Sequence, residues 1–167
     1  MSQHILVAGI GNLFLSDDGF GPEVARYLAA ENVLPDDVRV VDYGIRGMHL
    51  AYDLLDGCRA LVIVDAMPGE GSPGDVVVMQ VGAHDVGVAG APALDAHGMD
   101  PLAVLGSLQA LGGSMPATFV VGCRPANVEE GIGLSPQVEA AVPVAAAAVL
   151  RVIDERVLVD AELRGRS

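Results

Sequence analysis

Apolar residues along the chain are concentrated in five short runs, and most segments between these runs have the spacing of amphipathic helices. The runs are rich in Val, Ile, Leu and Ala, and they cover residues 5–8, 38–42, 59–65, 75–80 and 116–122. A continuous apolar run of this length is typical of a strand covered on both faces, as in a parallel sheet between helices. The pattern therefore predicts five strands in an α/β fold.

Helices are expected where apolar residues recur on one face and where glycine or proline marks an end. The expected helices cover about residues 22–31, 47–57, 102–111 and 136–156. Proline suits the first helical position because its missing N–H has no partner there, and serine suits the position before it. We therefore expect Pro22 to start the first helix and Ser135 to cap the last one.

The connection between the third and fourth strands restricts the topology. A parallel crossover needs about a dozen residues or more, whereas a short glycine- and proline-rich loop around residues 69–74 joins these two strands. The fourth strand should therefore run antiparallel to the third or lie at an edge of the sheet. Neither an internal repeat nor a linker is visible, so residues 1–167 are interpreted as one domain with three layers, α/β/α.

A weakly patterned segment follows the fourth strand. Residues 81–95 are mostly small, and His84 and Asp85 lie among them. Such a composition is typical of a mobile surface loop. The segment leads to His97, just before the third expected helix.

Composition narrows the kind of core and the kind of partner. The chain is 51% hydrophobic but only 4% aromatic, so its core must consist mainly of aliphatic side chains. The formal net charge is −13 and there is no lysine. Nucleic-acid binding is excluded as an interpretation, because neutralising phosphates needs clustered cations. Basic proteins and metal cations remain plausible partners.

Nothing in the sequence predicts a membrane segment or a secretory leader. The amino terminus has no basic region before its apolar run, unlike a signal peptide. The longest charge-free apolar run, residues 140–150, contains Pro143 and is far shorter than the roughly 20 residues that cross a bilayer. We therefore expect a cytoplasmic protein. Cys58 and Cys123 are widely separated and are interpreted as small buried hydrophobic residues.

The first strand leads into a glycine turn that carries two acids. Gly9 and Gly11 invite comparison with a dinucleotide-binding loop, but Phe14 occupies the position where that motif needs its third glycine. Asp17 and Asp18 at the loop tip would also repel a pyrophosphate. A nucleotide cofactor is therefore not expected.

Three polar side chains are predicted to meet at one edge of the sheet. Asp18 follows the first strand, Asp65 ends the third, and His97 precedes a helix. Ligands bind at the carboxyl ends of parallel strands, and two carboxylates with an imidazole suit nickel, zinc or iron. The pattern leaves alternatives open, because an aspartate at a strand end is often only a turn former or helix cap. His84 is the main competitor to His97, and Asp17 is interpreted as shaping the loop.

At these residues the chain resembles the nickel-iron hydrogenase maturation endopeptidases. The resemblance covers nearly the whole sequence, and its first and last motifs are the most specific. The matching motifs are G-I-G-N-x-x-x-x-D-D-G-x-G at residues 9–21, D-x-G at Asp42–Gly44, V-D-A at residues 64–66, His97, and G-L-S-P-Q-V-E at residues 133–139.

The resemblance implies a fold, an activity and a site. The fold would be a three-layer sandwich around a five-stranded, mostly parallel mixed sheet with one antiparallel strand. The activity would be removal of a C-terminal extension from a hydrogenase large-subunit precursor once nickel has been inserted. Asp18, Asp65 and His97 would form the catalytic nickel site, for which other divalent transition metals could substitute, and Asp42 and Gly44 would contact the substrate.

The resemblance also leaves choices open. Relatives commonly have Thr after the D-x-G turn where this chain has Ile45, and some have Glu where it has Asp18. The attacking water could be activated by the metal, which would arrive with the substrate, or by a carboxylate acting as a base. A non-enzymatic nickel-binding or assembly chaperone and a thiol hydrolase using Cys123 are alternative functions.

Overall fold

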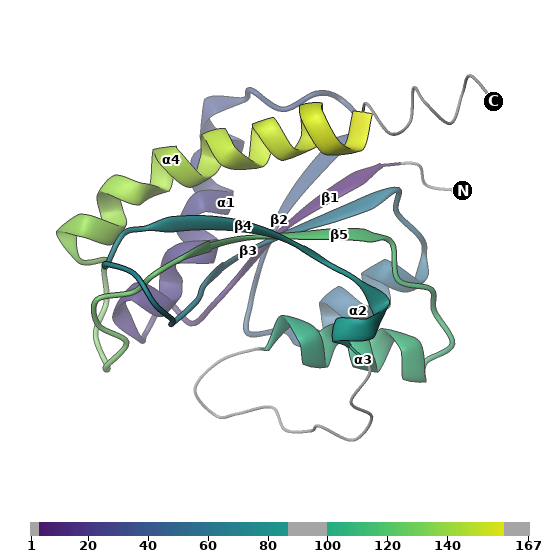
Figure 1. The fold of residues 1–167 in the computed structure, drawn as a ribbon, viewed down its shortest axis with the longest axis horizontal. Helices are drawn as coiled ribbons and strands as arrows, with labels where there is room; N and C mark the ends of the chain where they lie inside the picture. Colours follow the sequence, from purple (N-terminus) through teal and green to yellow (C-terminus); the bar gives the residue numbers. More distant parts are fainter. Residues whose placement is uncertain (1–3, 87–99, 159–167) are drawn as a thin grey trace.

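The computed structural model describes residues 4–86 and 100–158 and is built around a five-stranded mixed sheet (Figure 1). The strand order is β2-β1-β3-β5-β4. Four strands are parallel, and β4 pairs antiparallel with β5 at one edge. The strands are β1 (Ile5–Ile10), β2 (Val38–Gly44), β3 (Ala60–Ala66), β4 (Val76–Val81) and β5 (Ala117–Cys123). The predicted mixed sheet is confirmed, with the fourth strand antiparallel and at an edge.

Helices cover both faces of this sheet. Helices α1 (Phe20–Glu31) and α4 (Pro136–Val152) lie on one face, and α2 (Gly47–Leu55) and α3 (Pro101–Ala110) lie on the other (Figure 1). Two short 3₁₀ turns, η1 (Ser16–Gly19) and η2 (Ala83–Asp85), follow β1 and β4, and a π-helical turn η3 (Ile153–Leu158) continues α4. The structure is therefore the expected three-layer α/β/α sandwich.

The central strands are apolar along their whole length because both of their faces are buried. In β3, Val62 and Val64 face the core under α1 and α4, whereas Leu61 and Ile63 face the core under α2 and α3. Successive side chains of a strand point to opposite faces, so each layer of helices receives every second residue. This arrangement explains the continuous hydrophobic runs in the sequence.

Two local expectations need correction. Helix α1 begins at Phe20 rather than at Pro22, because η1 leads directly into it. Ser135 does occupy the position before α4, but its side chain makes no capping bond and instead donates to the carboxylate of Asp17. The loop expected at residues 81–95 contains η2, and residues 87–95 of it lie outside the described part of the chain.

The last helix is long and apolar. Residues Pro136–Val157 have the length and mean hydropathy, 1.4, of a helix that could cross a membrane, and half of the most apolar window is buried within the structure. The buried side chains of α4 belong to the core beneath α1 and α4. An apolar face packed on a sheet is a sufficient reason for this composition.

Helix α1 crosses the sheet at Gly21, where the backbones approach each other closely. A Cβ atom at this position would lie 2.2 Å from the carbonyl oxygen of Ile10 and 2.3 Å from that of Val64. Both atoms belong to the backbone of central strands, so they cannot move aside cheaply. Glycine at this position therefore sets how near η1 and α1 can lie to the ends of β1 and β3.

Gly21→Ala should lower the free energy of unfolding by about 2 kcal/mol or more, because the added methyl group overlaps backbone atoms. Gly106→Ala is the matched control, since a Cβ there meets nothing within 4 Å and the site lies inside α3. That change should stabilise the protein by about 0.5–1 kcal/mol. Urea denaturation of both variants measures the difference, and equal effects would contradict the close approach.

Candidate active site

Asp18 and Asp65 lie at the carboxyl-end edge of β1 and β3, close enough for the charge of Asp18 to raise the pKa of Asp65. Asp65 is the penultimate residue of β3, and only 7% of it is exposed. Asp18 lies in η1, the first helical turn after β1. Because β1 and β3 are parallel neighbours, their carboxyl ends meet at the same edge of the sheet. The sequence-based expectation that these two residues share this edge is therefore met.

The loop that presents Asp18 is fixed by hydrogen bonds within the loop itself. The backbone N–H of Asn12 donates to Oδ2 of Asp18 over 2.9 Å, and the N–H of Phe14 donates to Oδ1 of Asn12 over 2.9 Å. Gly11 has a positive φ of 148°, and a Cβ there would overlap the carbonyl oxygen of Asp18. Glycine at position 11 therefore allows the loop to pass close to the backbone of Asp18.

Both carboxyl groups are held in surroundings that oppose their ionisation. Burial raises the pKa of Asp18, although the Asn12 N–H works against this. Burial also raises the pKa of Asp65 well above its usual range, and the negative charge of Asp18 raises it further. An N–H bond from Ala66 opposes the shift of Asp65, and the charge of Asp100 adds to it. A cation placed between the two acids would relieve this repulsion.

Asp17 has a different role from its neighbour, because its side chain is fully buried and hydrogen-bonded. Its carboxylate accepts bonds from the backbone N–H groups of Ala126, Asn127 and Ser135, at 2.8, 3.0 and 2.7 Å, and from the hydroxyl of Ser135 at 2.9 Å. Burial would raise the pKa of Asp17, but these bonds outweigh it and the pKa is lowered. The expectation that Asp17 shapes the loop is met.

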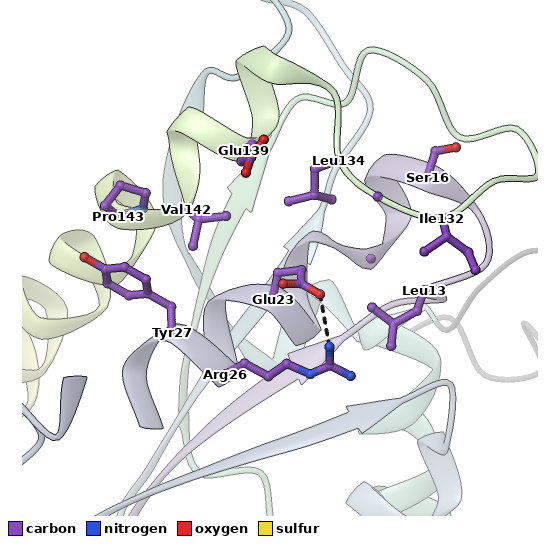
Figure 2. Close-up of a pocket in the computed structure, with 12 residues that line it drawn as sticks. Leu13, Ser16, Glu23, Arg26, Tyr27, Ile132, Leu134, Glu139, Val142 and Pro143 are labelled. Carbon is purple, nitrogen blue, oxygen red and sulfur yellow. Dashed lines mark hydrogen bonds and ion pairs between the residues drawn. The ribbon is translucent and has the colours of Figure 1, made fainter. Parts of the chain in front are cut away.

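Two cavities adjoin the acid pair. One of about 260 Å³ is lined by Asp65 together with residues from β4, β5 and α3, and another of about 260 Å³ is lined by Asp18, Ala66 and Pro125 among others. A larger cavity of about 730 Å³ lies between α1 and the start of α4. Figure 2 shows this larger cavity bordered by the ion pair of Glu23 and Arg26. Neither Asp18 nor Asp65 lines it.

The D-x-G motif forms the last three residues of β2 and is ordered by its own polar groups. Oδ1 of Asp42 accepts from the N–H of Gly44 over 3.0 Å, and Gly44 has a φ of 60°. The carbonyl oxygen of Gly44 accepts from the N–H of Gly11 over 2.9 Å. The end of β2 is therefore hydrogen-bonded to the acid-bearing loop. Ile45 beyond it is exposed.

Of the two histidines considered for the site, the structure describes His84 but not His97. His97 lies outside the described residues. His84 in η2 is exposed, and its Nε2 lies 3.5 Å from Oδ1 of Asp85. Within residues 4–86 and 100–158, no three His, Cys, Asp or Glu side chains gather as a metal-binding group. His84 therefore does not complete such a group with Asp18 and Asp65.

The thiol alternative is disfavoured by the surroundings of Cys123. This side chain is fully buried at the end of β5. Burial raises the pKa of its thiol to about 11, and burial likewise raises that of Cys58 to about 11. A nucleophilic cysteine needs an accessible thiolate near neutral pH. Cys123 has neither property.

Arg124 holds the loop that follows Asp65, a role that sequence reasoning missed. Its guanidinium donates to the carbonyl oxygens of Met67, Pro68 and Glu70 at 2.9, 3.2 and 3.0 Å. The loop after β3 is thereby fastened to the end of β5. An arginine at a strand end gives no sign in sequence of which carbonyl groups it will reach.

Comparison with known proteins agrees with this architecture. The family model described as hydrogenase maturation protease matches residues 22–152. The hydrogenase 2 maturation protease of Escherichia coli is 31% identical over 92% of each chain, and the hydrogenase expression/formation protein HupD of Rhodobacter capsulatus is 31% identical over 89% of this chain and 70% of its own. The solved structure of the hydrogenase maturating endopeptidase HybD from E. coli matches with a TM-score of 0.73 and 30% identity, covering 92% of this chain and 93% of that one.

The fold and these similarities define the protein as a peptidase. The chain belongs to the hydrogenase maturation protease family.

Asp17→Asn should destabilise the protein at pH 7 by about 2 kcal/mol, because at least one buried N–H donor would lose a charged acceptor. The folded-state pKa of Asp17 lies below its ordinary value of 3.8, so its contribution is present above that pH and is lost as the pH falls through the folded value. The difference in free energy of unfolding between Asp17→Asn and wild type should therefore become smaller as the pH falls. Asp36→Asn, on an exposed turn, is the control and should change stability by less than about 0.5 kcal/mol.

Proposed function

We propose that this protein is a cytoplasmic endopeptidase that removes the C-terminal extension of a nickel-iron hydrogenase large-subunit precursor after nickel insertion. Asp18, Asp65 and His97 would recognise the metal of the filled precursor. The observation that carries the proposal is the pairing of two carboxyl groups with raised pKa values at the carboxyl edge of the sheet. The maturation protease names of the relatives support the substrate class.

The chemistry of the acid pair supports a metal carried by the substrate. Two carboxylates that repel each other in a partly buried site gain most when a divalent cation arrives between them. An imidazole from His97 would add a nitrogen ligand and leave coordination positions for the precursor. In this scheme nickel is part of the substrate. A precursor without nickel therefore lacks the group that binds most strongly to the acid pair.

Peptide hydrolysis at this site needs one water molecule and one proton acceptor. The water oxygen attacks the scissile carbonyl carbon, the C–N bond breaks, and the departing amine takes up a proton. The raised pKa of Asp65 makes its carboxylate a stronger base than that of an exposed aspartate, and polarisation of the carbonyl by the substrate's metal would serve the same step. Both routes use the same pair of acids.

The proposed order of events is tested by mixing the protein with nickel-loaded and nickel-free precursor and following the precursor mass by mass spectrometry. Only the nickel-loaded form should lose its C-terminal extension, because the free carboxylates do not bind the empty precursor well. Equal cleavage of both forms would contradict the proposal that the protein recognises the precursor through its metal. Stable binding of nickel-loaded precursor with unchanged mass would indicate an assembly chaperone instead.

Asp18→Asn and Asp65→Asn should each lower the cleavage rate of nickel-loaded precursor by at least about 100-fold, since even indirect partners of a metal can matter that much. His97→Ala should do the same. Asp36→Asn is the matched control on an exposed turn and should cleave at the wild-type rate. Circular dichroism spectra confirm that the variants are folded. Full activity of any of these three site variants would remove that residue from the proposed machinery.

The turn formed by Asp42 and Gly44 is proposed to contact the precursor. In support, this turn is hydrogen-bonded to the acid-bearing loop through Gly11, and Asp42 is only partly buried. Ile45 next to it would then present an apolar side chain to the substrate.

A further inference from the structure

A cavity of about 260 Å³ opens beside Asp65. It is lined by β4, β5 and α3 as well as by the end of β3, and Figure 1 shows η2, at the end of β4, lying beside α3. We propose that this cavity binds the apolar side chain of a precursor residue that flanks the scissile bond. This inference rests on the proposed function, because the cavity shares Asp65 with the proposed catalytic site.

The floor of the cavity is apolar and already buried. Ile63, Leu105 and Val120 form it, and all three belong to the core beneath α2 and α3. The floor therefore offers no polar partner to a charged head group, and burying an unpaired charge there would be costly. An aliphatic side chain is the occupant that such a floor stabilises.

The walls are adaptable, and the volume suits one side chain. Met67 and Met79 line the cavity, and the unbranched thioether side chain adjusts to apolar partners of different shape. Pockets for whole small-molecule ligands usually measure about 300–1,000 Å³, whereas this cavity measures about 260 Å³. It matches part of a peptide better than a complete ligand.

Acidic groups at the mouth select against negatively charged residues. Oδ1 of Asp100 accepts from the N–H of Leu102 over 2.9 Å, and Oδ2 of Asp85 accepts from the N–H of Gly82 over 2.8 Å. Both carboxylates are thus engaged in turns of their own chain while their charges remain at the rim. A glutamate or aspartate side chain would meet repulsion on entry, and a neutral one would not.

The position of the cavity connects it with the reaction. Asp65 forms part of its wall, so a side chain seated in the cavity would place its own peptide group beside that carboxylate. A flanking residue held in this way would fix the scissile bond near the acid pair. Positioning of this kind contributes to rate as well as to selectivity.

The first test varies the substrate. The cleavage site of the nickel-loaded precursor is mapped by mass spectrometry, and each of the two flanking residues is changed in turn to Ala, Asp and Lys. We expect one flanking residue to be apolar. At that position, Ala should lower kcat/KM by at least about 10-fold, and Asp should lower it more than Lys.

The second test varies the cavity. Met79→Trp fills the cavity from its mouth, and Val78→Trp places the same ring on the neighbouring residue of β4, which does not line the cavity and is also exposed. Met79→Trp should slow cleavage of the native precursor by about 10-fold or more and should slow cleavage of the Ala-substituted precursor much less. Val78→Trp should leave the ratio of the two rates unchanged.

The outcomes separate this inference from the proposed function. Cleavage by wild type that does not depend on either flanking side chain would overturn the cavity assignment while the endopeptidase stands. Equal slowing of both precursors by Met79→Trp would overturn it too, since the cavity would then not select a side chain. Failure of wild type to cleave any nickel-loaded precursor would remove the proposed function and this inference together.

Discussion

The buried carboxylate of Asp17 is the interaction on which the geometry of the acid-bearing edge depends. It receives bonds from Ala126, Asn127 and Ser135, and these residues lie more than a hundred positions away in the sequence. One side chain thereby joins the loop after β1 to the segment between β5 and α4. A buried charge is tolerated only when it is hydrogen-bonded in this way. Because Asp17 is fixed, its neighbour Asp18 can be held in a less favourable setting.

The contrast between these two adjacent acids shows how one short loop serves stability and chemistry at once. Burial acts on both, yet hydrogen bonds lower the pKa of Asp17, whereas burial prevails at Asp18. At Asp65 the charge of Asp18 adds to burial. Strained or repulsive groups persist in folded proteins when the surrounding structure holds them. Gly21 and Arg124 belong to that surrounding structure, since they fix the start of α1 and the loop after β3.

Much of the fold could be predicted because the relevant information is local in the sequence. Apolar runs predicted the strands, and the short connection before β4 predicted its direction and its place at an edge. Asp65 was placed correctly because its strand was recognised. The partners of Asp17 and Arg124 could not be predicted, since they depend on which distant loops the sheet brings together. The same limit applies to Ser135, whose position before a helix predicted a cap although its hydroxyl binds Asp17.

The arrangement also gives a physical reason why such a simple acidic site need not attack other proteins. Burial raises the pKa values of both acids, and the charge of Asp18 raises that of Asp65 further. In the proposed function, the metal of a filled precursor would relieve this unfavourable setting, whereas a protein without the metal would not. A cavity that accepts an apolar flanking residue would add a second requirement that is independent of the metal. Since the two requirements act on different parts of the substrate, their free energies would combine, and selectivity would exceed what either the metal or the side chain supplies alone.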